Sequence, residues 1–365
     1  MKIICTKNNL RDAFQITERF TGKNLSLPII GNVFFEADDK KIRCVATNLE
    51  MGVEVVVPGK VIKNGCVALP GRIINTLIQS LGEETVFIEE KDGAITIKTD
   101  TANFTLQGAP TKDFPLLPKI KKEHEFSVPA SDFKNGLSQV LPAVSTSDFK
   151  PELSGVYFKR DTKTITIAAT DSFRLAEKVF PFSSSGDAVS CIIPGKTCQE
   201  LIRTLSEESG DNILVRIGES QITFDLSGIH IVSRLVDGTY PDYTSIIPKD
   251  FTTHFAVPRE DLVRQVKAAS ILSSKLNDIV VSSSDGEMFI EAANSEVGKS
   301  RIRLLTKAKG KDMRVSFNFR YLADGLEAAD GAEVLISLNS DTSPAVVCSP
   351  QDQTFRYILM PIRNV

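Results

Sequence analysis

The chain has 365 residues, of which 42% are hydrophobic and 24% charged, and its formal net charge is −3. This composition excludes a disordered chain, and because no run of 18 apolar residues occurs, the sequence predicts no membrane-spanning helix. The small negative charge disfavours nucleic-acid binding over the whole surface, although one basic face can bind phosphates while the remaining surface is acidic.

The first seven residues become polar at once, so we expect a cytoplasmic protein without a secretory leader. A helix is predicted next, over residues 8–20, with Asn8 or Asn9 as its N-cap. Its core-facing side chains recur at helical spacing: Leu10, Ala13, Phe14 and Thr17. Related helices are expected to begin near Ala130 and Pro258.

A second helix is predicted from Gly71, ending near Gly82. Its expected buried stripe consists of Ile73, Ile74, Leu77, Ile78 and Leu81. The start of this helix recurs twice, each time 124 residues further along: Leu69-Pro70-Gly71-Arg72, Ile193-Pro194-Gly195-Lys196 and Phe317-Asn318-Phe319-Arg320. A fixed long period indicates three copies of one structural unit.

Alternating apolar and polar stretches between the helices predict antiparallel strands, for example residues 94–98, 164–167 and 333–337. Asp92-Gly93 and Asp285-Gly286 are typical of tight hairpin turns. The predicted fold class is α+β, with two helices packed on antiparallel sheets in each of three repeated domains. Proline and charge interrupt the pattern near positions 118–123 and 247–250, which places the domains at residues 1–121, 122–249 and 250–365.

No motif indicates catalysis, a metal or a cofactor. Gly298-Lys299-Ser300 resembles the end of a phosphate-binding loop, but Ala293 replaces the required glycine and a strand pattern follows. We expect the three histidines to be surface or strand residues: His124, His230 and His254. Asp171-Ser172 and Asp242-Tyr243 fit turns better than an acid and a nucleophile.

The six cysteines form no C-x-x-C pair, which favours buried reduced thiols over zinc ligands or disulfides: Cys5, Cys44, Cys66, Cys191, Cys198 and Cys348.

Basic side chains recur at one position of the repeat, occupied by Arg72, Lys196 and Arg320. Further cations lie on the polar faces of the other helices: Arg11, Lys134, Arg264 and Lys267. A solvated helix face is one explanation. Repetition at an equivalent position favours a shared polyanion such as a duplex backbone. The third copy is the least basic, because Glu327 stands where Gln79 and Arg203 stand in the others.

Five segments together resemble the bacterial sliding clamp, the β subunit of DNA polymerase III. The segments match the family in order and are spread over nearly the whole chain: residues 27–32 (LPIIGN), 46–51 (ATNLEM), 169–176 (ATDSFRLA), 236–243 (VDGTYPDY) and 360–363 (MPIR). The resemblance implies a non-catalytic processivity subunit and half of a pseudo-six-fold ring. Two chains would encircle duplex DNA as a homodimer, with no membrane and no cofactor.

The resemblance also implies partners: the replicative polymerase subunit, a clamp loader, and repair polymerases and mismatch-repair proteins that bind through short Leu/Phe peptides. The matching peptide pocket comprises Leu153, Thr170, Ser172, Phe173, Leu175, Pro241, Ile246, Asn318, Tyr321, Ile358, Met360, Pro361, Ile362 and Arg363. Core packing is the alternative for each apolar member alone. The family commonly has Gly-His at Ser172-Phe173, so that side of the pocket is expected to be bulkier and more apolar. The family's usual ending is also one residue shorter, so we expect a different peptide preference.

By the same matching, DNA contacts are expected from Arg11, Lys23, Asn24, Arg72, Lys134, Ser147, Lys196, Arg203, Arg264 and Lys267. The same matching places four residues at the dimer interface, with burial in a monomer core as their alternative: Phe104, Leu106, Ile271 and Leu272.

Two rival functions are considered. One is a metal-dependent nuclease or nucleotidyl transferase, which needs clustered carboxylates. The other is a protein-interaction scaffold that never meets DNA.

Overall fold

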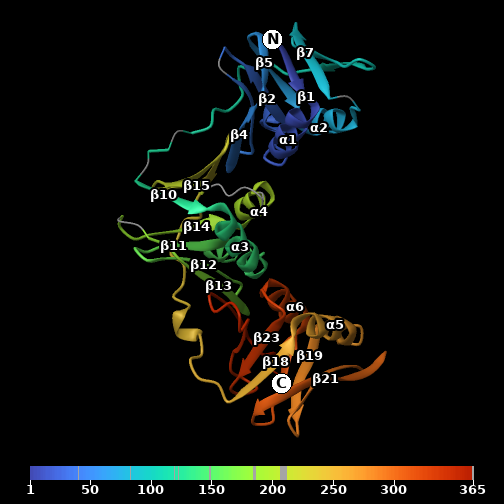
Figure 1. Cartoon of the computed structure of the whole chain (residues 1–365), viewed down its shortest axis with the longest axis vertical. Coiled ribbons are helices and arrows are strands. Elements are labelled where there is room, and N and C mark those ends of the chain that lie inside the picture. Colours follow the sequence, from blue (N-terminus) through green and yellow to red (C-terminus); the bar gives the residue numbers. More distant parts are fainter. Residues whose placement is uncertain are drawn as a thin grey trace. The chain divides into compact units, whose positions relative to one another are not determined.

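The computed structural model describes residues 1–39, 41–82, 84–118, 120–121, 123–147, 149–183, 186–205 and 212–363. These residues form two compact units, one of Met1–Ser131 with Arg203–Leu235 and one of Asp132–Ile202 with Val236–Val365. Figure 1 shows helices packed beside sheets in each unit. Every strand pairing among the described residues is antiparallel, as the sequence predicts: 22 strand pairs, from β1·β5 to β8·β9.

The first unit contains a five-stranded sheet of order β5-β1-β7-β8-β9 and an eight-stranded sheet of order β10-β15-β16-β17-β4-β3-β2-β6. Its strands are β1 (Lys2–Thr6), β2 (Asn32–Ala37), β3 (Ile42–Thr47), β4 (Met51–Val57), β5 (Gly59–Lys63), β6 (Gly65–Pro70), β7 (Thr85–Lys91), β8 (Ala94–Lys98), β9 (Asn103–Gln107), β10 (His124–Pro129), β15 (Asn212–Ile217), β16 (Gln221–Leu226) and β17 (Ile229–Arg234).

Helix α1 (Lys7–Glu18) carries the core face that the sequence predicts, with Leu10, Ala13, Phe14 and Thr17 all buried. The predicted N-cap is wrong. Thr6, in extended backbone, accepts a hydrogen bond from the Asn9 amide at 3.3 Å and caps the helix two or three residues earlier. The Phe14 ring then packs on Phe35 of β2, with centroids 5.4 Å apart.

Helix α2 (Gly71–Ser80) buries Ile74 and Ile78 as predicted, but Ile73 is 53% exposed. Asn75 belongs to the buried face of α2, and its side-chain amide donates a hydrogen bond to the Glu18 carboxylate of α1. Position 73 is therefore rotated toward solvent. The helix also ends before Gly82, because Leu81 already has extended backbone.

The second unit contains a twelve-stranded sheet of order β14-β11-β12-β13-β25-β24-β23-β18-β21-β20-β19-β22. Its strands are β11 (Gly155–Arg160), β12 (Thr164–Thr170), β13 (Arg174–Pro181), β14 (Val189–Pro194), β18 (Thr253–Pro258), β19 (Asp278–Ser284), β20 (Glu287–Asn294), β21 (Gly298–Gly310), β22 (Arg314–Asn318), β23 (Glu333–Leu338), β24 (Ala345–Cys348) and β25 (Phe355–Leu359). Its helices are α3 (Ala130–Val140), α4 (Gly195–Thr204), α5 (Arg259–Ser270) and α6 (Phe319–Ala328).

Short 3-10 turns complete the elements: η1 (Pro28–Gly31) in the first unit, and η2 (Leu141–Ala143), η3 (Pro151–Leu153) and η4 (Thr244–Ile246) in the second. Both predicted hairpin turns are confirmed, because Asp92 and Gly93 join β7 to β8, and Asp285 and Gly286 join β19 to β20, all with positive φ. The phosphate-loop look-alike at Gly298 lies in strand β21, as the sequence predicts.

Each large sheet crosses a boundary between repeats. Strand β17 of the second repeat pairs with β4 of the first, and β25 of the third repeat pairs with β13 of the second. Strands β4 and β13 occupy equivalent positions, since Met51 and Leu175 are 124 residues apart. A strand near the end of one repeat thus repeatedly joins an early strand of the preceding repeat.

The cysteines are free, as expected, and Cys5, Cys44 and Cys198 are buried. Burial raises the pKa of the Cys5 thiol to about 12, which keeps it protonated and unreactive at neutral pH. The expectation of burial is wrong for Cys66, which is exposed on β6 because its side chain points to the outer face of the sheet. Among the described residues, no helix is long and apolar enough to cross a membrane.

Gly325 provides a stability test in the second unit. It lies on α6 directly against the Tyr357 ring of β25, and a Cβ at this position would come within 2.4 Å of a ring carbon. We expect Gly325→Ala to destabilise the chain by about 1–3 kcal/mol through overpacking. Thermal denaturation measures it, with Gly82→Ala as the control, because a Cβ there meets nothing within 4 Å. A Gly325→Ala chain as stable as the control would contradict this packing.

Candidate functional site

The three repeated cations occupy the same place on three helices. Arg72, Lys196 and Arg320 are each the second residue of their helix, and all three side chains are exposed. None of them forms an ion pair with a described residue. Repetition therefore places unneutralised positive charge at one end of α2, α4 and α6, where a polyanion can approach.

The other predicted helix cations are partly neutralised by neighbours. Arg11 pairs with Asp12 at 2.9 Å and Arg264 with Asp261 at 2.5 Å. Lys267 of α5 pairs with Glu327 of α6 at 2.6 Å, so the acidic residue of the third repeat cancels a nearby cation. Lys134 is half-buried on α3, whereas Arg203 is exposed on α4.

The two predicted loop contacts have structural roles in their turns. The Asn24 side chain accepts hydrogen bonds from the amides of Ser26 at 2.8 Å and Leu27 at 3.2 Å, while Lys23 beside it is exposed. The Ser147 hydroxyl accepts a hydrogen bond from the Phe149 amide at 3.4 Å. These hydrogen bonds hold both loops in a defined shape. In the first loop, Lys23 is exposed to solvent and available for a phosphate contact.

The second candidate site lies in the second unit, where the turn between β12 and β13 meets the C-terminal segment. The Met360 amide donates to the Phe173 carbonyl at 2.9 Å, and the Ile362 amide donates to the Ser316 carbonyl at 2.8 Å. Phe173 is 61% exposed, and Met360, Pro361 and Ile362 are half-buried. The chain end therefore brings apolar side chains to the surface beside Phe173.

The turn itself is held by Thr170 and Asp171. The Thr170 hydroxyl accepts a hydrogen bond from the Ser172 amide at 3.1 Å and donates to the Arg174 carbonyl at 2.6 Å. The Asp171 carboxylate accepts the amide hydrogen bonds of Phe173 at 2.9 Å and Arg174 at 3.0 Å. Ser172 takes a φ of 78° at the tip, so the turn is fixed before any ligand arrives.

Arg174 is the residue at this site that sequence reasoning did not select. Its Nε donates to Asp171 at 3.0 Å, and its Nη1 donates to Asp324 of α6. Its guanidinium also lies 4.2 Å from the centre of the Tyr321 ring. Burial alone would lower the pKa of Arg174, but Tyr357, Asp324 and Asp171 outweigh burial and raise this pKa, so the side chain stays charged.

The Asp171-x-x-Arg174 spacing was the available signal for this ion pair. Its link to α6 depends on the tertiary fold and could not be inferred from spacing.

Three of the predicted pocket residues lie beneath this surface in a core cluster. Leu153, Leu175 and Ile358 are at most 3% exposed, and they pack with Ala168, Ile192, Tyr240, Tyr243 and Val346. The Tyr243 hydroxyl donates to Glu177 at 2.8 Å, and burial together with this carboxylate raises the pKa of Tyr243. The cluster is the rigid support on which the exposed residues rest.

The remaining predicted pocket residues surround this support. Asn318 caps α6 by accepting hydrogen bonds from the Arg320 and Tyr321 amides, and Tyr321 is half-buried. Pro241 is exposed between the two core tyrosines, Ile246 is 46% exposed, and Arg363 is exposed. Apolar surface and a few fixed polar groups thus come together, which is the anatomy of a site for a peptide anchor.

The predicted interface residues are largely exposed in the single chain. Phe104 is 37% exposed and Leu106 half-buried on β9, which is the last strand of its sheet. Ile271 is 77% exposed and Leu272 half-buried just after α5. Burial of all four in a monomer core therefore does not occur.

Groups of three or more metal-ligating side chains are not found among the described residues. The histidines lie in strands, as expected. His230 of β17 contacts Asp225 at 2.6 Å, and His254 of β18 contacts the Ser337 hydroxyl at 2.9 Å.

Comparison with known families covers nearly the whole chain. Models of the DNA polymerase III beta subunit match its N-terminal domain at residues 1–118, its central domain at residues 127–242 and its C-terminal domain at residues 244–363. The chain belongs to the DNA polymerase III beta subunit family. It is a DNA sliding clamp of the replicative polymerase and a non-catalytic processivity subunit.

Relatives of this family align along their full length. The chain is 28% identical to the beta sliding clamp of Bacillus subtilis, over 100% of both chains. It is 27% identical to that of Synechococcus elongatus, over 100% of this chain and 99% of the other. The crystal structure of the Bacillus subtilis clamp matches with a TM-score of 0.93 at 27% identity, covering 100% of both chains.

The clamp of Pseudomonas aeruginosa bound to griselimycin shares the fold, with a TM-score of 0.95 at 24% identity and 100% coverage of both chains. The three-domain α+β architecture predicted from the repeat is therefore confirmed for this family member.

Proposed function

We propose that two copies of this chain close head to tail into a ring of six similar domains that encircles duplex DNA. The domains run over residues 1–121, 122–249 and 250–365. The family models support these bounds, since the first ends at 118, the second spans 127–242 and the third begins at 244. The ring tethers the polymerase through topology, because a closed ring can slide without releasing the duplex.

The repeated strand pairing is the observation that carries this proposal. Strand β17 pairs with β4, and β25 pairs with β13. In both cases a strand near the start of one repeat, here called the early strand, pairs with a strand near the end of the following repeat, the late strand. The third early strand is β21, offset by another 124 residues. Among the described residues, positions 299–306 of β21 pair with β20 alone. The late strand of the first repeat is β9, and within the described part of the chain its one strand partner is β8. Pairing β9 of one copy with β21 of another completes the pattern and closes the ring.

The apolar residues beside these two open edges support the same interface. Phe104 lies on β9, Leu305 on β21 is 94% exposed, and Ile271 is 77% exposed. Open strand edges bearing exposed apolar side chains associate readily.

Phe104→Asp with Ile271→Asp tests the ring. We expect the doubly substituted chain to sediment as a monomer of 40.0 kDa, and the unaltered chain at twice that mass. Leu25→Asp, at a fully exposed leucine of the first unit, is the control and leaves the dimer intact. A monomeric unaltered chain, or a dimer that survives both substitutions, would refute the proposed ring.

The charge distribution supports sequence-independent DNA binding. The ten DNA-contact residues expected from sequence include Arg72 and Lys196, which keep unneutralised charges, and Arg264 and Lys267, which do not. Weak phosphate attraction holds the duplex centred yet lets the ring slide, whereas base readout would stop it.

Partner binding is proposed at the surface formed by Phe173, Ile246 and Met360 over the Leu175 core. The replicative polymerase, the clamp loader, repair polymerases and mismatch-repair proteins would dock there through short peptides with Leu and Phe anchors. Phe173 makes this surface more apolar than the family's usual histidine would. We place this activity in the cytoplasm, where bacterial DNA is replicated.

A further inference from the structure

The first unit contains a second hollow, on the outer face of its eight-stranded sheet. Its volume is about 950 Å³, within the range of ligand-binding pockets. Residues 109–118 and 120–121, here called the connector, follow β9 in the chain and lead toward β10. The connector supplies one wall of the hollow: Thr111, Lys112, Phe114, Pro115, Leu116, Leu117, Pro118 and Ile120. None of these residues belongs to the partner surface of the second unit.

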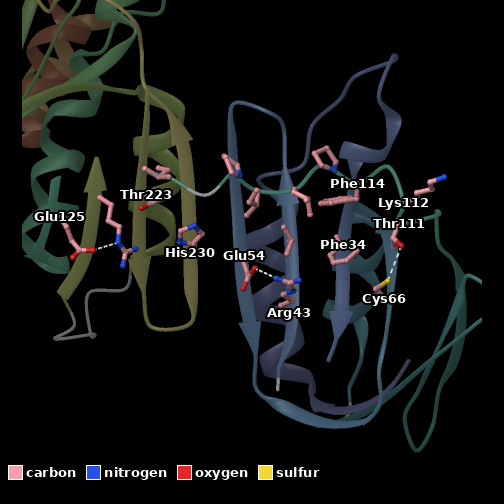
Figure 2. A pocket seen from close by; sticks show the side chains of 17 residues that line it. Phe34, Arg43, Glu54, Cys66, Thr111, Lys112, Phe114, Glu125, Thr223 and His230 are labelled. Atoms are coloured by element: carbon pink, nitrogen blue, oxygen red, sulfur yellow. Dashed lines mark hydrogen bonds and ion pairs between the residues drawn. The ribbon is translucent and has the colours of Figure 1, made fainter. Parts of the chain in front are cut away.

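The hollow is long rather than round. Figure 2 shows its lining side chains spread from Glu125 and His230 at one end to Cys66 and Lys112 at the other. They come from all eight strands of the sheet, β10 through β6 in sheet order, and from the connector. At about 4.7–4.9 Å between strands, the hollow extends roughly 33 Å, the length of about ten extended residues.

The connector is pinned at both ends of its apolar stretch. The Phe114 ring packs on Phe34, with centroids 5.3 Å apart. Leu117 fills the space above Gly52 of β4, where a Cβ would lie only 2.3 Å from a Leu117 methyl. Between these anchors Leu116 is 93% exposed. The wall is therefore fixed in place while it offers apolar surface to solvent.

The floor is polar and already ordered by ion pairs. Arg43 bridges Glu36 at 2.5 Å and Glu54 at 2.9 Å, and Arg216 pairs with Glu125 at 2.6 Å. Asp225 takes a further bond from Arg216 and contacts His230. These carboxylates are occupied, so they present little free negative charge to a ligand.

Two groups on the lining are left for a ligand. Thr223 is 2% exposed, and its hydroxyl has no hydrogen-bond partner in the described structure. A buried hydroxyl without a partner is costly and rare in native proteins. Lys112 is exposed at the other end and makes no ion pair with a described residue. The free positive charge of Lys112 is the complement of an acidic group.

We propose that this hollow is a second docking groove, which binds an extended peptide segment of a partner protein bearing apolar side chains and an acidic residue. The apolar side chains contact Phe114 and Leu116, the carboxylate pairs with Lys112, and a backbone group of the peptide bonds the Thr223 hydroxyl. The groove gives the ring a partner contact on the first unit that is independent of the peptide surface around Met360.

The probe is a fluorescein-labelled peptide of eight residues that alternates Leu or Phe with Asp, titrated against the full chain carrying Met360→Glu. That background removes binding at the other proposed surface. We expect the probe to bind this chain, and Thr223→Val to weaken binding about fivefold through the loss of one hydrogen bond. Lys112→Glu weakens it further and reduces its salt dependence. Lys98→Glu, at an exposed residue of β8 in the other sheet, leaves it unchanged.

Thr223→Val also raises the melting temperature of the peptide-free chain, because an isosteric methyl replaces an unsatisfied hydroxyl. The melting temperature distinguishes two roles of the Thr223 hydroxyl. If the hydroxyl stabilised the sheet rather than bound a ligand, its loss would lower the melting temperature. Affinities of the Thr223→Val and Lys112→Glu chains equal to that of their background would overturn the proposal. Loss of dimer mass in Lys112→Glu would assign the face to self-association and overturn it too.

Discussion

A ring loaded on a circular duplex is expected to stay bound through gel filtration and to be lost once the circle is cut. The full chain is loaded onto nicked plasmid by an ATP-driven loader, and the complex is separated from free protein. Cutting at one site opens an end from which the ring slides. Retention then falls to the level seen without a loader, because the cations of α2 and α4 attract phosphates too weakly to hold DNA alone.

The salt dependence of retention on DNA distinguishes encirclement from binding through phosphate contacts. A protein held by six to ten phosphate contacts loses about 10³- to 10⁵-fold in affinity between 50 and 200 mM salt. A topological link does not depend on those contacts, so retention on the circle should persist at 200 mM. Retention on linear DNA without blocked ends would exclude encirclement.

Charge reversal at Arg72, Lys196 and Arg320 is the accompanying variant. These side chains are exposed and have no ion pair with a described residue, so their reversal should leave the fold intact. We expect slower loading, since the inner face of the ring would then repel the duplex, while rings already loaded stay on the closed circle. Unchanged loading would favour the scaffold that never meets DNA.

Much of the fold was predictable because local signals agree with the repeat. Asp92-Gly93 and Asp285-Gly286 have the residues that positive φ requires, and both form tight hairpin turns. Leu10 and Phe14 are buried because helical spacing fixes their face. Ile73 was misplaced because the hydrophobic pattern does not reveal where a neighbouring helix lies. The contact of Asn75 with Glu18 sets the rotation of α2.

The candidate site was predictable only in part, for a related reason. The C-terminal Met360 and the turn at Phe173 could be matched to the family one residue at a time. Their meeting depends on the pairing of β13 with β25, in which Leu175 lies opposite Ile358, 183 positions further along the chain. No local pattern encodes that pairing. Arg174 and Asp324 were missed because their contact joins a strand to α6 of another repeat.

The connector groove carries no sequence motif at all. Phe114 and Leu116 read as ordinary loop residues until the sheet beneath them is known. The partnerless hydroxyl of Thr223 is a tertiary property, since an alternating strand pattern gives no information on whether a side chain finds a partner. Sites that depend on an unsatisfied group are therefore found only in the structure.

Peptide binding at the C-terminal surface is expected to be abolished by Phe173→Glu with Met360→Glu. Both residues are partly exposed, and their amide and carbonyl groups bond each other, so the substitutions alter the surface without disturbing the backbone. A charge on this apolar surface removes the contacts of the peptide's anchor residues. We expect a loss of about 2–4 kcal/mol in binding free energy, which is roughly a 30- to 1,000-fold loss of affinity. Fluorescence anisotropy with a labelled peptide bearing Leu and Phe anchors measures this loss.

Leu175 is not suitable for the same substitution, although it belongs to the family's pocket. It is 1% exposed within the core cluster, so a charge there would unfold the support rather than test the surface. Phe149→Glu is the matched control, because this phenylalanine of the second unit is 97% exposed and lies outside the proposed pocket. The dimer mass should be unchanged in both variants. A doubly substituted chain that binds the peptide as tightly as the Phe149→Glu control would show that partners dock elsewhere.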